Sequence, residues 1–134
     1  MNGFEKYNFQ EFCYQTINEL GFSKPTSIQE KVIPLVYKNN DIIGISQTGT
    51  GKTHAFLLPV MDQIDTNQDC VQAVITAPTR ELATQIYNNA KLFVKYNEEI
   101  RVSLLIGGSD RQKSVNKLTV QPHIVIGTPG RIKD

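Results

Sequence analysis

Long hydrophobic runs are missing from this sequence of 134 residues. One of the longest, residues 56–61, is far too short to span a bilayer. No apolar segment follows the polar start at residues 1–6, so we expect no secretory signal. The two cysteines, Cys13 and Cys70, match no metal-binding spacing, so we expect two reduced, partly buried thiols. A cytoplasmic location is the expectation that follows from these absences.

A strong charge of one sign is also absent, because the net charge is only +1. The bulk charge therefore does not indicate a nucleic-acid-binding protein. The distribution is less even, since residues 1–78 carry five basic and eight acidic side chains, whereas residues 79–134 carry nine and five. We therefore expect any contacts with a polyanion in the second half of the chain.

No internal repeat, low-complexity segment or flexible linker divides the chain, so we predict one domain. We expect helices at residues 9–20, 25–36, 52–64, 80–96 and 110–119. Short apolar runs predict buried strands at residues 42–45, 71–77, 102–106 and 123–126. This alternation predicts an α/β fold, with a parallel β-sheet sandwiched by helices. Ligands of such sheets bind at the carboxyl ends of the strands, where the glycine-rich segments of this chain fall.

Two signals mark the ends of the first two helices. Gly21 follows the first helical pattern and is typical of a helix C-cap. The second helix has two overlapping capping-box patterns, Thr26 with Gln29 and Ser27 with Glu30.

The strongest local motif lies between a predicted strand and a predicted helix. It reads Ser46-Gln47-Thr48-Gly49-Thr50-Gly51-Lys52-Thr53. Glycines allow such a loop to curl with its N–H groups around a phosphate, Lys52 can reach the β- and γ-phosphates, and the Thr53 hydroxyl can bind Mg²⁺. Ser46 stands where the common pattern has its first glycine. The alternative, a flexible turn that caps a helix, does not explain the Lys-Thr pair.

This segment resembles motif I of the DEAD-box RNA helicases. Residues 21–29 resemble the Q motif of that family, and Phe4 lies 17 residues before Gly21, where the family keeps an isolated aromatic residue. The resemblance implies that the Gln29 amide reads the adenine edge, that Phe4 lies against the adenine ring, and that the backbone of Lys24 assists. A capping role alone for Gln29 and a frayed terminal position for Phe4 are the alternatives.

Three further segments resemble family motifs that contact the sugar-phosphate backbone of single-stranded RNA. Residues 78–85 resemble motif Ia, residues 107–108 the glycine doublet, and residues 128–131 motif Ib. The implied RNA-binding residues are Pro78, Thr79, Arg80, Gly107, Gly108, Thr128, Pro129, Gly130 and Arg131. Such contacts read strand geometry and not base sequence. Taken singly, each segment is equally well explained as a capped helix start or a tight turn.

The resemblance implies that residues 1–134 form part of an N-terminal RecA-like P-loop domain, with a Q motif at 4–30 and motif I at 46–53. The Asp-Glu-Ala-Asp motif and the second lobe are expected beyond Asp134. The whole protein is then expected to be an ATP-dependent RNA helicase with ATP and Mg²⁺ as cofactors, and with Lys52 and Thr53 as catalytic residues. This chain alone is expected to bind nucleotide at most weakly, and an exposed sheet edge is expected to give it limited stability or self-association.

Two other functions stay open. The chain could act as a non-catalytic module that binds nucleotide or RNA, or as an unrelated P-loop ATPase. His54, His123, Pro34 and Pro59 are interpreted as structural residues.

Overall fold

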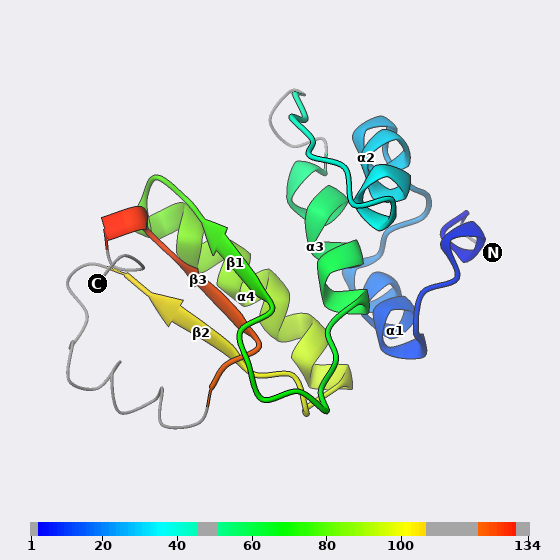
Figure 1. Cartoon of the computed structure of the whole chain (residues 1–134). Helices are drawn as coiled ribbons and strands as arrows, with labels where there is room; N and C mark the ends of the chain where they lie inside the picture. Colours follow the sequence, from blue (N-terminus) through cyan, green and yellow to red (C-terminus); the bar gives the residue numbers. More distant parts are fainter. Residues whose placement is uncertain (1–2, 46–50, 107–120, 131–134) are drawn as a thin grey trace. The chain divides into compact units, whose positions relative to one another are not determined.

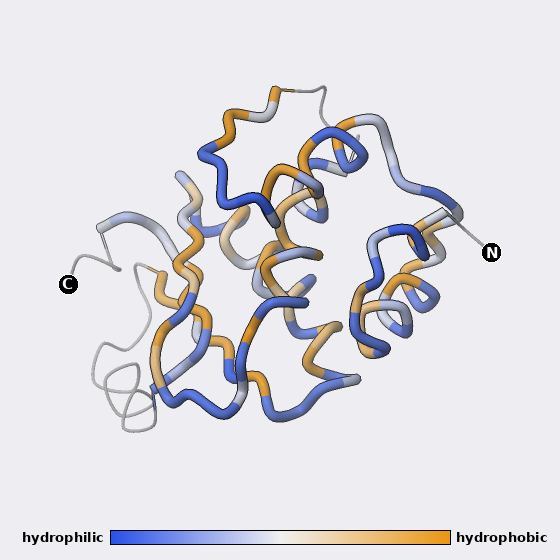
Figure 2. The backbone as a smooth tube through the Cα atoms, turned by 45° about the vertical axis from the view of Figure 1, so that its right-hand side comes forward, coloured by the Kyte–Doolittle hydropathy of each residue, from blue (hydrophilic) through white to orange (hydrophobic). Residues whose placement is uncertain are grey.

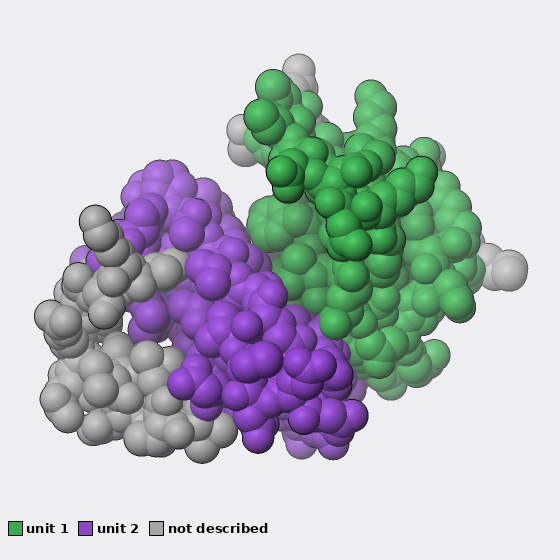
Figure 3. Space-filling model, in the orientation of Figure 1, with its two compact units in different colours: residues 1–63 green, residues 64–134 purple. Residues whose placement is uncertain are grey.

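The computed structural model describes residues 3–45, 51–106 and 121–130. The chain divides into two compact units, residues 1–63 and residues 64–134 (Figure 3). The two units are described separately below.

Unit 1 is helical. It contains a short 3-10 helix, η1 at Glu5–Tyr7, followed by α1 at Glu11–Leu20, α2 at Ser27–Tyr37 and α3 at Lys52–Asp62 (Figure 1). Helix α3 packs against both α2 and α1. Large apolar side chains form the core of the unit, among them Ile17, Ile33, Leu57, Leu58 and Met61, all fully buried.

Two of the predicted capping signals in unit 1 are confirmed. Gly21 ends α1 in the left-handed region with φ of 75°. At the start of α2, Thr26 and Gln29 form the first of the two possible capping boxes. Because both of these signals act within a few residues, they are independent of the rest of the fold.

The predicted strand at residues 42–45 is not formed. The segment belongs to no β-sheet, and the side chains of Ile43 and Ile45 are 91% and 86% exposed. Figure 2 shows it as a mostly hydrophobic stretch that leads into residues 46–50, which lie outside the described residues. A strand needs a neighbour to satisfy its backbone N–H and C=O groups, and none of the described strands pairs with this segment.

Unit 2 is built on a parallel three-stranded sheet. Its elements are β1 at Ala73–Thr76, α4 at Arg80–Tyr96, β2 at Val102–Leu105 and β3 at Ile124–Gly127. The strand order is β1-β3-β2, so the last strand in sequence lies in the centre. The predicted α/β class and the parallel sheet are therefore confirmed, with three of the four expected strands. The helix predicted at residues 110–119 lies outside the described residues.

Helix α4 packs against β2 and β3 and has the bounds that the sequence predicts. Its buried side chains follow helical spacing: Ala83, Ile86, Ala90 and Phe93. Thr79 caps the helix, because its Oγ1 accepts a hydrogen bond from the Leu82 N–H at 3.1 Å. All four residues of the central strand β3 are buried.

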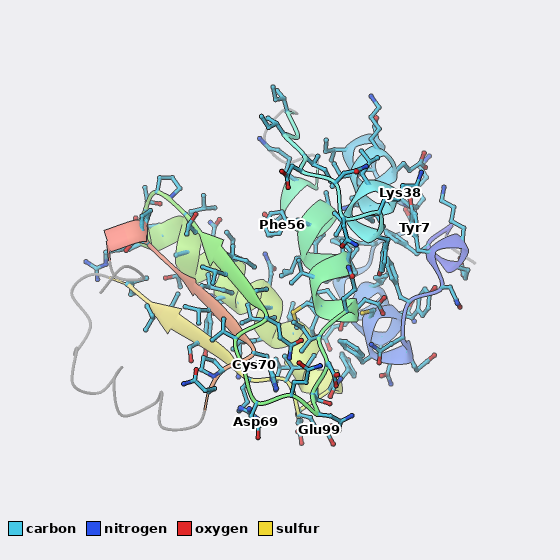
Figure 4. The ribbon with its side chains drawn as sticks, viewed as in Figure 1. Tyr7, Lys38, Phe56, Asp69, Cys70 and Glu99 are labelled. Atoms are coloured by element: carbon cyan, nitrogen blue, oxygen red, sulfur yellow. The ribbon has the colours of Figure 1, made fainter. Side chains whose placement is uncertain are left out.

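Polar residues hold the amino ends of the strands in unit 2. Arg101 lies just before β2 and binds the Asp69 carboxylate at 3.0 Å and the Gln121 carbonyl oxygen at 2.8 Å. The Arg101 N–H also donates to Nδ1 of the fully buried His123, at 3.0 Å. Asp69, Cys70 and Glu99 are labelled at this end of the unit in Figure 4.

The two cysteines are free. Cys13 is fully buried, and burial together with the Asp62 charge raises the pKa of its thiol. Cys70 is exposed, so the prediction of partial burial is wrong for this residue.

Candidate functional site: a glutamine against the phosphate-loop helix

The buried amide of Gln29 lies at the start of α2 and contacts the residue before α3. Its Oε1 accepts from the Thr26 N–H at 3.0 Å, and its Nε2 donates to the carbonyl oxygen of Gly51 at 3.2 Å. The residue is only 2% exposed. A glutamine amide has two N–H groups and two oxygen lone pairs, and these two bonds to described residues use one of each. Gln29 therefore caps its own helix and contacts the loop end at the same time.

Gly51 is the N-cap of α3 and lies in the left-handed region with φ of 89°. A Cβ atom at this position would lie 2.6 Å from Gln29 Nε2 and 2.9 Å from Thr26 Oγ1. Glycine is therefore required here both by backbone conformation and by the close approach of α2.

The first turn of α3 carries the Lys-Thr pair. Lys52 is exposed and Thr53 is half-buried, and no side chain of the described residues caps this helix through a hydrogen bond. The first-turn N–H groups point along the helix axis at its positive end, where an anion is stabilised. The remaining residues of the predicted phosphate loop, 46–50, lie outside the described residues.

Phe4 lies inside an aromatic cluster. It is fully buried and stacks on Phe22, with a distance of 6.4 Å between ring centroids and an angle of 25° between ring planes. Phe22 is half-buried and contacts the His54 ring edge-on at 5.0 Å. Phe22 thus connects Phe4 to His54 of α3, and the sequence did not indicate this role for Phe22. Lys24 is exposed.

His54 is buried directly after the Lys-Thr pair. Burial lowers the pKa of its imidazole to about 4, so this side chain is neutral at physiological pH. Its packing against Phe22 fits the structural role predicted for it.

A hollow of about 380 Å³ lies beside α2 and α3. Apolar side chains such as Ile28, Val32 and Phe56 line it together with Lys52, whereas Gln29 is not part of the lining. A nucleotide carries more hydrogen-bonding groups than these walls satisfy, so we do not assign the hollow to a nucleotide.

The predicted RNA-binding residues that the structure describes lie at the carboxyl edge of the sheet. Thr76 of β1 is paired with Gly127 of β3, so residues 78–80 and residues 128–130 leave the sheet side by side. The Ala77 N–H donates to the Gly127 carbonyl oxygen at 3.0 Å, which holds the two exits together.

The side chains at this edge face solvent for the most part. Pro78, Thr79, Arg80, Pro129 and Gly130 are exposed, and Thr128 is half-buried. Gly107, Gly108 and Arg131 lie outside the described residues. Six of the nine predicted residues therefore lie at the same edge of the sheet.

Two negative findings apply to the described residues. None of the described helices is long and apolar enough to cross a membrane. In the same part of the chain, no group of histidine, cysteine, aspartate and glutamate side chains could hold a metal ion.

Known proteins provide an independent comparison. The chain is 54% identical to the DEAD-box ATP-dependent RNA helicase CshB of Listeria monocytogenes, over 98% of this chain and 30% of that protein. The same protein of Bacillus subtilis is also 54% identical, with the same coverage. The chain thus spans about a third of the length of these curated relatives.

Solved structures show the same relationship. A DEAD box protein from the hyperthermophile Methanococcus jannaschii matches with a TM-score of 0.88 and 35% identity, over 97% of this chain and 35% of that chain. Dbp5 of S. cerevisiae, bound to RNA and ADP BeF3, matches with a TM-score of 0.86 and 29% identity, over 98% and 33%. The family model for DEAD/DEAH box helicases matches residues 26–134. The chain therefore belongs to the DEAD/DEAH box helicase family.

Proposed function

We propose that unit 1 binds an adenine nucleotide and that Gln29 reads the base. The observation that carries this proposal is the buried Gln29 amide, which bonds to the loop end at Gly51 and, among the described residues, uses one of its two N–H groups and one of its two lone pairs in these bonds. The Watson–Crick edge of adenine offers an amino donor beside a ring-nitrogen acceptor, which an amide matches with two hydrogen bonds. Guanine presents the opposite order of groups and would be rejected, because buried polar groups would be left unpaired.

The phosphates would lie at the start of α3. Lys52 and the first-turn N–H groups would bind them together with the loop of Ser46, Gln47, Thr48, Gly49 and Thr50. Thr53 offers a hydroxyl oxygen, which is a ligand type that Mg²⁺ accepts, so it would hold the ion against the nucleotide. Mg²⁺ would supply charge neutralisation on the phosphate oxygens. Lys52 and Thr53 are thus the proposed catalytic residues of this segment.

Phe4 and Lys24 differ in how easily an adenine ring could reach them. Phe4 is fully buried against Phe22, so an adenine ring would reach its face only if this stack opened. The backbone of Lys24, on the exposed turn before α2, is a contact that needs no such change.

Unit 2 would bind the backbone of single-stranded RNA at the carboxyl edge of its sheet. Thr79 and Arg80 at the start of α4, together with Pro78, Thr128, Pro129 and Gly130, present a hydroxyl, a guanidinium and N–H groups to phosphate oxygens. Gly107, Gly108 and Arg131 are proposed to extend this surface.

The whole protein would be an ATP-dependent RNA helicase, as CshB is named, and this chain would be part of its N-terminal RecA-like domain. It would contribute the nucleotide-binding residues and part of the RNA-binding surface. Since this chain spans about a third of such proteins, we expect at most weak nucleotide binding from it alone. The free thiols fit the cytoplasmic location proposed for it.

Calorimetric titration with ADP, ATP and GTP in the presence of Mg²⁺ tests the adenine assignment. We expect ADP and ATP to bind and GTP to bind at least about tenfold more weakly, and we expect Gln29→Ala to abolish the preference. Equal binding of GTP and ATP would disprove the role of Gln29.

RNA binding is tested separately with a fluorescent single-stranded oligonucleotide at several salt concentrations. Arg80→Gln should weaken binding equally for different base sequences and reduce the salt dependence by about one released counterion. Lys91→Gln, an exposed cation on the same helix, is the matched control. Equal losses in the two variants would show that the edge is not a specific surface.

A further inference from the structure

Asp62, the last residue of α3, joins all three main helices of unit 1. Its Oδ1 accepts from the Gln10 N–H at 2.7 Å, and its Oδ2 accepts from the Tyr37 hydroxyl at 2.6 Å. Its backbone carbonyl oxygen also accepts from the Gln10 side-chain amide. Gln10 is the N-cap of α1, and Tyr37 is the last residue of α2. One carboxylate therefore bonds to the start of one helix and the end of another.

A carboxylate at this position needs these partners. Asp62 lies at the C-terminal end of its own helix, where the helix dipole disfavours a negative charge. The same carboxylate accepts the Gln10 N–H at the positive end of α1, which has no side-chain cap of its own. Burial, the hydrogen bond from Tyr37 to Asp62 and the nearby charge raise the pKa of Tyr37, so its hydroxyl stays protonated as a donor.

Helices α2 and α3 are thereby joined at both ends. At the amino ends, Gln29 bonds to Gly51, and at the carboxyl ends, Tyr37 bonds to Asp62. In α2 the two contacts are eight residues apart, a length of about 12 Å, and in α3 they are eleven residues apart, a length of about 16 Å. The two helices therefore run parallel, and their register is fixed at two points.

Each of these helices also contains a proline between its two contacts. Pro34 in α2 and Pro59 in α3 cannot donate the backbone hydrogen bond of a helix interior. A helix that lacks this bond bends more readily. The Gln29–Gly51 contact at the amino ends therefore does not by itself fix how α2 lies along α3 over their full length.

We infer that Asp62, through Tyr37, is a positioning residue for adenine recognition: it fixes the register of α2 against α3 and thereby the place of the Gln29 amide. This inference rests on the proposed function of unit 1. Neither Asp62 nor Tyr37 would touch the nucleotide. Their removal would change how well Gln29 discriminates between bases, because the amide would no longer be held at one place against Gly51.

The test compares Tyr37→Phe and Asp62→Asn in the full chain with a matched control, Tyr7→Phe. The control makes the same chemical change in the same unit, at a hydroxyl that is buried without a hydrogen-bond partner among the described residues. Two quantities are measured for each variant: the ratio of GDP to ADP dissociation constants, and the NMR signals of the Gln29 side-chain amide without nucleotide.

We expect Tyr37→Phe and Asp62→Asn to shift the Gln29 amide signals and to lower the selectivity ratio by about three- to tenfold, as expected when one discriminating hydrogen bond is misplaced. The double variant should lose little more than either single variant, because both act through one bond. Tyr7→Phe should change neither quantity.

A merely structural role would lower the melting temperature and weaken both nucleotides equally. An unchanged ratio with unchanged Gln29 signals in Tyr37→Phe and Asp62→Asn would overturn the inference. The NMR measurement uses no nucleotide, so it tests the positioning role even if the wild-type chain fails to bind ADP. A failure to bind ADP would contradict the proposed function, whereas unmoved Gln29 signals in the variants would contradict the positioning role of Asp62.

Discussion

The Gln29 side-chain amide donates to the carbonyl oxygen of Gly51, with a distance of 3.2 Å between Nε2 and oxygen. The bond joins two residues that are 22 positions apart and brings a capped helix start onto the end of the predicted phosphate loop. In the proposed function, this one side chain would link base recognition to phosphate binding within unit 1.

Gln29→Glu should destabilise unit 1 and abolish ADP binding. A glutamate has nearly the same shape, but its carboxylate cannot donate to Gly51 and would be buried beside a carbonyl oxygen. We expect a loss of about 1–3 kcal/mol in the free energy of unfolding, the cost of an unsatisfied buried polar group. Thermal denaturation and calorimetry measure the two effects. Glu30→Gln, the reverse change at the exposed neighbour, is the control and should do little.

Gly51→Ala should be more harmful than Gly21→Ala. Both glycines lie in the left-handed region, so each alanine costs about 1–2 kcal/mol from backbone strain. At Gly21 a Cβ atom meets nothing within 4 Å, whereas at Gly51 it would contact Gln29 Nε2. We therefore expect an additional loss of about 1–3 kcal/mol for Gly51→Ala in urea denaturation. Equal losses would show that α2 does not closely approach Gly51.

Gly127→Ala should disrupt the sheet of unit 2. A Cβ atom on this residue would lie 2.0 Å from the backbone oxygen of Leu105, in the neighbouring strand β2. Because backbone atoms cannot move aside as a flexible side chain can, β2 and β3 must separate locally. We expect a loss of about 1–3 kcal/mol by chemical denaturation. Gly130→Ala is the control, since a Cβ atom there meets nothing within 4 Å.

Unit 2 should lose stability at mildly acidic pH. Burial and the nearby Arg101 lower the pKa of His123 from its ordinary 6.5, although the charges of Asp69 and Asp65 act in the opposite direction. The unfolded chain therefore binds the proton more readily than the folded one does. The free energy of unfolding should be highest above pH 6.5 and should fall as the pH drops from 6.5 toward the lowered pKa.

His123→Asn tests this pH dependence. The asparagine Oδ1 can replace Nδ1 as the acceptor for the Arg101 N–H, but it does not titrate. Urea denaturation of both proteins between pH 5 and pH 8 gives the free energy of unfolding at each pH. This free energy should change less steeply with pH in the variant than in the wild type. Identical slopes would assign the effect to other groups.

Val74→Lys should reduce self-association. Among the described strands, β1 pairs only with β3, and its Val74 side chain is 55% exposed beside the free edge. An exposed apolar edge strand is a template for pairing with another chain, and a lysine there opposes such pairing. Sedimentation velocity should show fewer oligomers for the variant than for the wild type. A monomeric wild-type chain would contradict this prediction.

Features that depend on near neighbours in sequence were predicted well. The bounds of α4, the capping box of Thr26 and Gln29 and the C-cap at Gly21 all follow from signals within four residues. The parallel sheet also followed, because β-strands separated by helices leave few topologies to choose from.

Features that depend on distant residues were predicted less well. The segment at residues 42–45 has the composition of a buried strand, but composition cannot supply a hydrogen-bonding neighbour. For Gln29, the sequence indicated the cap of α2, whereas the bond from its amide to Gly51 joins residues that are 22 positions apart and no local pattern indicated it. Asp62 and Tyr37 belong to no motif, so no local pattern could have indicated their contact.

The central position of β3 has a consequence for synthesis of the chain on the ribosome. Strands β1 and β2 do not pair with each other, and each pairs with β3, which is the last of the three to be made. The sheet of unit 2 therefore cannot assemble until residue 127 has left the exit tunnel. Until then its two outer strands have open hydrogen-bonding edges, whereas α2 and α3 of unit 1 can already pack. The nascent chain would gain its helical half first and would need protection for its strands in the interval.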